Sequence, residues 1–443
     1  MGIISKQSIK FLMNATTDKR GRLFLYNNSI FRGMWSKNKE YYSQLIDFIE
    51  KNKVLNQYIV NTKISNIEVE SFKTVLEHEY LENITYPNEW SSDMFISAAL
   101  KHIDINIELY KAGYNLEDAH LWNLTFKKGN PLYLDFASIS KNTSKAKKIQ
   151  LINEYLNFVL FPIVLIQFGH WDKAKKYLSA SIPCLTIEDI SGYQLGSLEK
   201  SPFLDIVNLI KAYAFKIKIK NIKKMAEKDF IKSLELIKSL ILEKKCNNSQ
   251  SVWQNYHADE NKKKNIQEMH DKQKSIINLI DTLKPETVLD FGCATGYYSY
   301  LCAKKGCNVT ASDIDDYIVN EVYNGAKVQD LLLNTIHYDL FRHDNKSKFK
   351  SEMVLSLAVI HHLVFSSKYN FEKIAEVFSE LTDKYLITEF IDKNDIFVKE
   401  RLTDEFSFYN IENFKNALSK YFVRCEEYPS SSENRTILLF YKE

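Results

Sequence analysis

The residues best suited to chemistry form a short loop between a predicted strand and a predicted helix. The segment Val288-Leu-Asp-Phe-Gly-Cys-Ala-Thr-Gly296 begins as an apolar run and then carries two glycines separated by three small residues. Glycine adopts positive φ at no steric cost and lets the backbone approach a ligand closely. The helix predicted from Tyr297 to Lys305 presents free N–H groups at its start. The loop is therefore expected to hold a nucleotide-type cofactor through Asp290, Gly292, Cys293, Thr295 and Gly296.

A carboxylate at the end of the next predicted strand completes this pattern. The run Val309-Thr-Ala-Ser-Asp313 places Asp313 seventeen residues after Gly296, and an acid at about this distance can hold both ribose hydroxyls of a nucleotide. The spacing D-x-G-x-x-x-G differs from the dinucleotide pattern G-x-G-x-x-G. It resembles motif I of class I S-adenosylmethionine (SAM) methyltransferases. This resemblance implies SAM as cofactor, no metal, and further cofactor contacts from Ile314, Asp339, Leu340 and Ala358.

Strands continue to alternate with helices after Asp313, which predicts a parallel sheet. Further strands are expected at 336–340, 353–360 and 385–391, followed by a hairpin of 421–427 with 435–441. Five parallel strands closed by an antiparallel hairpin strand resemble the class I methyltransferase topology. The expected fold class of residues 265–443 is thus α/β, with a Rossmann-like sheet.

Two histidines at the end of the fourth predicted strand are candidates for catalysis. Methyl transfer requires in-line positioning and removal of a proton from the nucleophile, and a neutral histidine suits the second task. The alternation of a strand would put His361 and His362 on opposite faces, so that only one faces the methyl group. Glu389, at the end of the fifth strand, is a second candidate for substrate contact. The alternatives are that both histidines only orient the loop, and that the nearby charged residues, Asp392, Lys393 and Asp395, form a salt-bridged loop rather than a substrate rim.

A second constellation lies in the N-terminal half. Asp118, His120 and Asn123 stand as D-x-H-x-x-N, and Asp135 follows on the second strand of a predicted hairpin. This arrangement resembles the catalytic loop and metal-binding aspartate of the aminoglycoside-phosphotransferase and protein-kinase fold. The resemblance implies that Asp118 accepts a hydroxyl proton while Asn123 and Asp135 hold Mg²⁺ between phosphates.

This half departs from the kinase pattern in two ways. It has no glycine-rich loop before the first hairpin, and it offers at best Arg32 where a phosphate-binding lysine is expected. A degenerate kinase-like α+β domain is therefore predicted. The alternative is an unrelated α+β domain in which the aspartate and asparagine cap a turn.

The organisation of the chain follows from these segments. We expect a kinase-like domain over 1–200, a basic helical bridge and linker over 201–264, and the methyltransferase domain over 265–443. Trp253 and Tyr256 either close over the cofactor or pack on the sheet. A net charge of +3 does not argue for a nucleic-acid partner. Six cysteines without a C-x-x-C pair, no signal peptide and no membrane span predict a cytoplasmic protein, and nothing indicates its oligomeric state.

The chain as a whole is similar to NoeA-type nodulation methyltransferases. The resemblance rests on 88–100, 116–126, 288–296, 357–363 and 388–390. It implies SAM-dependent methylation of a small molecule or saccharide, with O-methylation as the leading expectation. Two alternatives stay open: a bifunctional kinase and methyltransferase of surface-glycan synthesis, and a nucleic-acid methyltransferase that uses the basic helices.

Overall fold

The computed structural model describes residues 4–12, 19–141, 144–167, 171–179, 221–226, 228–242, 251–256 and 269–442. Contacts within the chain form two compact units. The N-terminal unit comprises Met1–Asn88, Phe95–Phe126 and Asn130–Asn247, and the C-terminal unit comprises Glu89–Met94, Lys127–Gly129 and Asn248–Glu443. Most of the predicted basic bridge, and the start of the domain expected from 265, lie outside the described residues.

The C-terminal unit is built on a seven-stranded sheet in the order β10-β9-β8-β11-β12-β14-β13. The first five strands in this order are parallel, and β14 runs antiparallel to both of its neighbours. The bounds are β8 Thr287–Phe291, β9 Asn308–Asp313, β10 Leu333–His337, β11 Ser351–Ser356, β12 Thr382–Ile391, β13 Arg424–Pro429 and β14 Arg435–Tyr441. The predicted α/β topology is confirmed.

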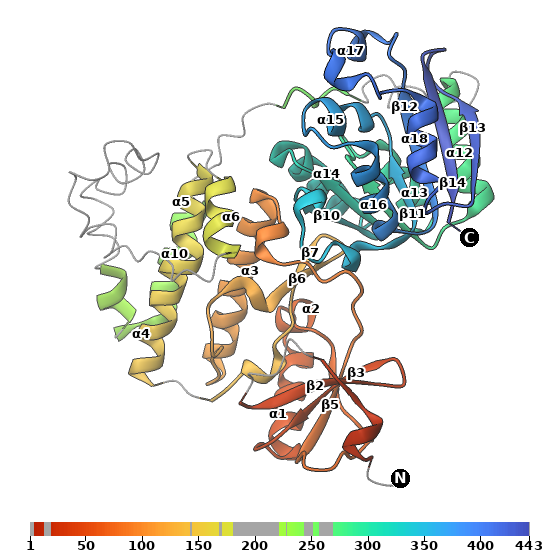
Figure 1. The fold of residues 1–443 in the computed structure, drawn as a ribbon. Coiled ribbons are helices and arrows are strands. Elements are labelled where there is room, and N and C mark those ends of the chain that lie inside the picture. The colour runs from red at the N-terminus through yellow and green to blue at the C-terminus, as the bar shows by residue number, and fades with distance from the viewer. Residues whose placement is uncertain are drawn as a thin grey trace. The chain divides into compact units, whose positions relative to one another are not determined.

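Helices cover both faces of this sheet because successive strand residues point to opposite sides. Val288 joins one apolar cluster with α12 (Asp271–Leu283), α13 (Tyr297–Lys304) and α14 (Asp316–Val328). Its neighbour Leu289 joins the other cluster, with α16 (Phe371–Leu381) and α18 (Ile411–Leu418). The result is a three-layer arrangement around a sheet that is apolar on both faces (Figure 1).

Two predicted strand ends are wrong. The fourth strand was expected to continue to Ile360, but β11 ends at Ser356. Ala358 then takes a φ of +56°, a conformation that no strand residue adopts, and the short helix α15 (Ile360–Phe365) begins. Similarly, β10 ends at His337, and Asp339 is the N-cap of a 3₁₀ turn, η9 (Leu340–Arg342).

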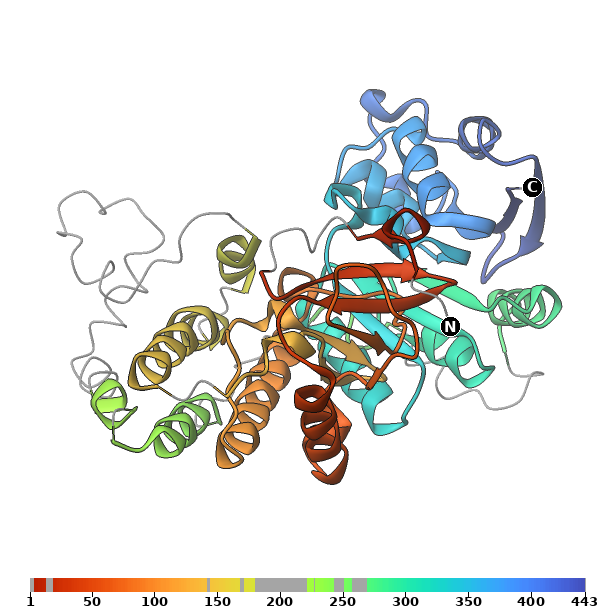
Figure 2. The ribbon, with the colours of Figure 1, turned by 90° about the horizontal axis from the view of Figure 1, so that it is seen from below.

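The N-terminal unit is α+β, as predicted. Its main sheet has the order β1-β2-β3-β5-β4, all antiparallel, and α1 (Lys39–Lys51) packs beside it (Figure 2). The strands are β1 Lys10–Phe11, β2 Gly21–Tyr26, β3 Ser29–Met34, β4 Thr62–Ile64 and β5 Thr74–His78. The predicted first hairpin is thus confirmed. Tyr58 ends the short helix α2 (Leu55–Tyr58), and Ile59 forms a single β-bridge to Tyr133.

The rest of this unit is mainly helical. The long helix α3 (Ser92–Lys111) precedes a small hairpin of β6 (Leu124–Lys127) and β7 (Asn130–Tyr133), as expected. The further helices are α4 (Lys145–Glu154), a π-helical turn η6 (Tyr155–Leu160), α5 (Phe161–Gln167), α6 (Trp171–Ser179) and α10 (Phe230–Leu242). None of the helices in the described part of the chain is long and apolar enough to span a bilayer.

Candidate active site

The strand order places a crevice at the carboxyl ends of β8 and β11. The chain runs from β8 outward to β9 and β10, and then returns to the other side of β8 as β11. Ligands of open α/β sheets bind where the order reverses in this way. The loops after β8 and β11 meet there, because a Cβ built on Gly292 would lie 2.6 Å from Val359 Cγ2.

The glycine loop has the conformation that the sequence predicts. Gly292 and Gly296 have φ of +73° and +75°, which glycine adopts without strain. The N–H groups of Gly292 and Cys293 both donate to the Ser312 carbonyl, at 2.8 and 3.1 Å, and this ties the loop to β9. Gly296 is the N-cap of α13. The backbone therefore forms a cradle without side chains, which suits a nucleoside cofactor.

Asp313 closes this cradle from the end of β9. Its carboxylate accepts hydrogen bonds from the Ala294 N–H at 3.1 Å and the Asp315 N–H at 3.0 Å. Burial raises the pKa of Asp313 to about 6, although these backbone hydrogen bonds oppose the shift. The predicted ribose-binding acid thus lies against the glycine loop, as its place in the motif requires.

Asp290 has a different setting from the other loop residues. It is buried, and Ser299 Oγ of α13 donates to its carboxylate at 2.5 Å. Burial raises the pKa of Asp290 to about 6. The hydrogen bond to Ser299 joins β8 to α13, which indicates that Asp290 fixes the loop rather than reaching a ligand.

The remaining predicted cofactor residues surround the same edge. Ile314 is 72% exposed directly after Asp313, where an apolar side chain is free to cover a ligand. Asp339 accepts from the Phe341 N–H at 3.0 Å. Of the others, Cys293, Leu340 and Ala358 are buried and Thr295 is half-buried.

His361 and His362 lie in the first turn of α15, not at a strand end. Their ring centroids are 4.0 Å apart, so the two side chains lie together and the predicted opposite orientation is wrong. His361 is buried, its Nδ1 has no hydrogen-bond partner among the described residues, and burial lowers its pKa to about 3. His362 is half-buried, and burial lowers its pKa as well. Both imidazoles are therefore neutral at pH 7.

Residues 251–256, which precede the sheet in the chain, also contact the carboxyl edge of the sheet. The Trp253 ring packs edge-on against His362 with centroids 5.4 Å apart, and Tyr256 packs on Trp253 at 5.8 Å. Ser251 Oγ donates to Asp315 Oδ2 at 2.6 Å. Residues 251–256 thus connect the end of β9 with α15, which favours the predicted placement of these aromatics over the cofactor edge.

Glu389 is in a buried ion pair that sequence reasoning missed. Its side chain is fully buried, and its two oxygens accept from Lys272 Nζ at 2.7 Å and Ser430 Oγ at 2.5 Å. Burial lowers the pKa of Lys272, but the Glu389 carboxylate more than offsets this, so the pKa of Lys272 is raised. An acceptor could reach Glu389 only by breaking this pair, so we assign Glu389 a positioning role. Lys272 stands on the apolar face of α12, and that position was the one available signal.

Asp395 also belongs to an ion pair. Arg435 donates to its carboxylate through Nε at 2.9 Å and through Nη2 at 3.4 Å. Asp392 accepts instead from the Asn394 backbone and side chain, at 3.0 and 2.8 Å. Of the three charged residues in this segment, Asp395 is therefore salt-bridged, whereas Asp392 is held by hydrogen bonds.

Comparison with known proteins agrees with this geometry. Residues 253–413 match the family described as "Tellurite resistance protein TehB". The chain is 25% identical to Nodulation protein NoeA of Rhizobium meliloti (strain 1021) over 479 aligned residues, which cover 96% of this chain and 94% of that protein. The chain is a SAM-dependent methyltransferase.

Solved structures with a weaker likeness include magnesium protoporphyrin IX methyltransferase from Synechocystis PCC 6803. It is 21% identical, the match covers 38% of this chain and 81% of that chain, and the TM-score is 0.30. The bifunctional kinase-methyltransferase WbdD is 18% identical, with 38% of each chain covered and a TM-score of 0.30. Scores this low say nothing further about this chain.

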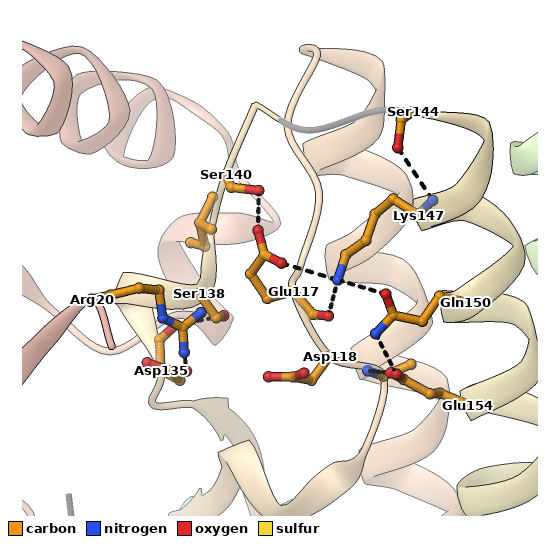
Figure 3. Close-up of polar contacts among 12 residues, drawn as sticks. Arg20, Glu117, Asp118, Asp135, Ser138, Ser140, Ser144, Lys147, Gln150 and Glu154 are labelled. Carbon is orange, nitrogen blue, oxygen red and sulfur yellow. Dashed lines mark hydrogen bonds and ion pairs between the residues drawn. The ribbon is translucent and has the colours of Figure 1, made fainter. Parts of the chain in front are cut away.

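The predicted Mg-ATP residues of the methyltransferase lie in its N-terminal unit. Asp118 precedes the 3₁₀ turn η4 (Leu121–Asn123), Asn123 is the last residue of that turn, and Asp135 follows β7. Both oxygens of Asp135 are paired: Arg20 Nη2 lies 3.0 Å from Oδ2, and Arg32 Nη1 lies 3.0 Å from Oδ1. Figure 3 shows Arg20 over this carboxylate. Two guanidinium groups neutralise Asp135 and would repel a divalent cation at the same oxygens.

The loop that carries Asp118 is fixed to α4. Lys147, which is buried, forms an ion pair with Glu117 Oε2 at 3.0 Å and also donates to the Glu117 carbonyl. Glu154 Oε2 accepts from the Ala119 N–H at 2.8 Å (Figure 3). Asp118 itself is half-exposed, and His120 Nε2 lies 3.9 Å from it. The loop is thus held on both sides of Asp118.

We expect Mg-ATP to leave the melting temperature of this methyltransferase unchanged. Arg20 and Arg32 occupy the carboxylate that the kinase pattern assigns to the metal, and a ligand raises the melting temperature only in proportion to its affinity for the folded state. Differential scanning fluorimetry with and without Mg-ATP measures this. A saturable rise in melting temperature that Asp135→Asn abolishes would instead restore the kinase reading.

Proposed function

We propose that this enzyme transfers a methyl group from SAM to an oxygen of a saccharide or another small molecule. The observation that carries the proposal is the neutral pair of His361 and His362, next to the loop contact between Val359 and Gly292. The resemblance to NoeA-type nodulation methyltransferases implies a small-molecule or saccharide acceptor, and the match to Nodulation protein NoeA covers 96% of this chain. Cytoplasmic location is part of the proposal, supported by four free thiols within the described residues, Cys293, Cys302, Cys307 and Cys425.

The two histidines divide the work in this proposal. SAM supplies a methyl group that is already activated, so the protein has to orient the acceptor hydroxyl and take its proton as the new C–O bond forms. His362 is the more accessible ring and is the proton acceptor. His361 is buried behind it, and its low pKa makes it a poor base. His361 therefore positions His362, while Trp253 packs edge-on against the His362 ring.

The acceptor half of the proposal is tested by mass spectrometry of a panel of mono- and disaccharides incubated with SAM and the full chain. Wild type should add one methyl group to a hydroxyl, and His362→Ala should slow transfer by roughly 100-fold or more, the contribution of a positioned base. SAM binding by calorimetry should be the same in both proteins. Methylation only at nitrogen or carbon, or equal rates with and without His362, would contradict it.

The proposed contact of Asp313 with the SAM ribose predicts that SAM affinity depends on pH. The Asp313 carboxylate can accept ribose O–H groups only when it is ionised, and its pKa is about 6. SAM affinity should therefore rise as the pH passes through 6 and become constant above about pH 7. Well below pH 6, the affinity should fall by about tenfold for each pH unit. Calorimetry between pH 5 and pH 8 measures this.

A matched pair of variants identifies the titrating group, because Asp290 has a pKa of about 6 as well. Asp313→Asn should bind SAM weakly and without this pH dependence, whereas Asp290→Asn should keep the dependence. Tight SAM binding by Asp313→Ala, or an affinity that does not change over this range, would remove Asp313 from the cofactor site.

A further inference from the structure

A cavity lies at the C-terminal end of α15, the helix that carries His361 and His362. It has a volume of about 370 Å³ and is lined by the end of α15 and by the segment that follows α17 (Ile396–Lys399): Phe365, Ser366, Lys368, Arg401, Thr403, Glu405 and Phe406. Phe365 and Phe406 form an apolar wall, with ring centroids 4.9 Å apart. Small-molecule sites combine such apolar walls with a few polar groups.

Among the residues that the structure describes, one cation of the cavity has no counter-ion. Lys368 and Glu405 neutralise each other, with Nζ and Oε2 3.2 Å apart. Arg401 has an exposed side chain, and among the described residues it makes neither a side-chain hydrogen bond nor an ion pair. A guanidinium group presents donors in a planar fork that matches carboxylate and phosphate oxygens.

Two other cations of the C-terminal unit are already paired. Lys272 is bound to Glu389, and Arg435 is bound to Asp395. Nearby Lys393 and Lys399 are exposed but do not line the cavity. Arg401 is thus the unpaired cation of the cavity itself.

Helix α15 connects the proposed cofactor site with this cavity. Val359 contacts Gly292 at one end of this helix, and Ser366, whose N–H donates to the His362 carbonyl at 2.9 Å, lines the cavity at the other. Over the seven helical steps from Val359 to Ser366, the helix rises by roughly 10 Å. Phe365 lies on the same helix face as His361, four residues earlier. The charge of Arg401 also reaches both histidines and adds to the lowering of their pKa.

We propose that this cavity holds an anionic group of the acceptor, and that Arg401 selects acceptors that carry a phosphate or a carboxylate in addition to the methylated hydroxyl. The inference rests on the proposed function, because it assigns an acceptor class to the same site. An acidic saccharide fits this requirement, because its anion would pair with the Arg401 guanidinium.

The test compares three probes that differ in charge. Glucose 6-phosphate, glucuronate and glucose are titrated by calorimetry into the full chain saturated with S-adenosylhomocysteine. At least one anionic probe should bind wild type more tightly than glucose, and the phosphate and carboxylate arms show which anion the cavity prefers. Arg401→Gln should weaken that probe about tenfold, the scale of one charge-assisted hydrogen bond, and leave glucose unchanged.

Lys399→Gln is the matched control, because Lys399 is an exposed cation two residues from Arg401 that does not line the cavity. It should bind all three probes like wild type. The proposal is overturned if neither anion binds wild type more tightly than glucose, if Arg401→Gln has no effect, or if Lys399→Gln weakens binding as much. The affinity of wild type for S-adenosylhomocysteine is measured in a separate titration. If wild type does not bind S-adenosylhomocysteine, the proposed function is contradicted rather than this inference.

Discussion

Replacing Gly292 by alanine should weaken SAM binding by about 100-fold or more. The φ of +73° strains any residue with a Cβ, and that atom would also lie 2.6 Å from Val359 Cγ2. Backbone strain alone costs about 1–3 kcal/mol, and every 1.4 kcal/mol is tenfold in affinity. The loop can relieve the clash only by moving away from β11, which opens the cradle. Calorimetry with SAM measures the loss.

Gly306→Ala is the control for backbone strain in the same unit. Gly306 has a φ of +94° after α13, but a Cβ there would meet no atom within 4 Å. This variant should lower the melting temperature and retain SAM binding at the wild-type affinity. If the two alanine variants lose SAM binding equally, strain anywhere in the unit is responsible and the contact of Gly292 with Val359 is not important.

Replacing Lys272 by methionine should destabilise the C-terminal unit by about 3 kcal/mol or more. The change leaves the fully buried Glu389 carboxylate without its cation, and breaking one side of a buried pair is strongly destabilising. Urea denaturation of the full chain, followed by the loss of SAM binding, measures the free energy of unfolding. The double variant Lys272→Met/Glu389→Leu should recover most of that loss, because no unpaired charge remains buried.

An exposed pair on the same helix separates burial from charge. Lys274 and Asp271 are 43% and 62% exposed and lie 3.5 Å apart, and such pairs contribute at most about 1 kcal/mol. Lys274→Met should therefore unfold at nearly the wild-type urea concentration. A double variant as unstable as Lys272→Met would mean that Glu389 acts through contacts other than this ion pair.

Local sequence was enough to predict the cofactor loop. Two glycines at a strand-to-helix turn are needed because the backbone takes positive φ there, and the acid at the end of the next strand follows from the length of one βαβ unit. The strands and helices of the C-terminal unit were predicted for the same reason, since apolar periodicity is a local property. The predicted strand ends were less accurate. Nothing in the apolar sequence up to Ile360 indicated that Ala358 would adopt a φ of +56°.

The roles of the polar residues depended on partners far away in the sequence. Glu389 looked like a substrate contact at a strand end, but its counter-ion Lys272 stands 117 residues earlier. Asp135 has the spacing of a metal ligand, yet Arg32, 103 residues before it, pairs with its carboxylate. The two histidines stay a prediction as catalytic residues, but the contact between their rings was not foreseen, because α15 replaces the expected strand end.

The sequence by itself thus determined the cofactor and the sheet topology, because each depends on backbone conformation and periodicity over a few residues. Only the tertiary structure decided which side chains remain available to an acceptor. Buried charges require partners, and those partners come from distant segments. Glu389, Asp395 and Asp135 are each held in an ion pair, whereas our proposals assign acceptor contacts to His362 and Arg401.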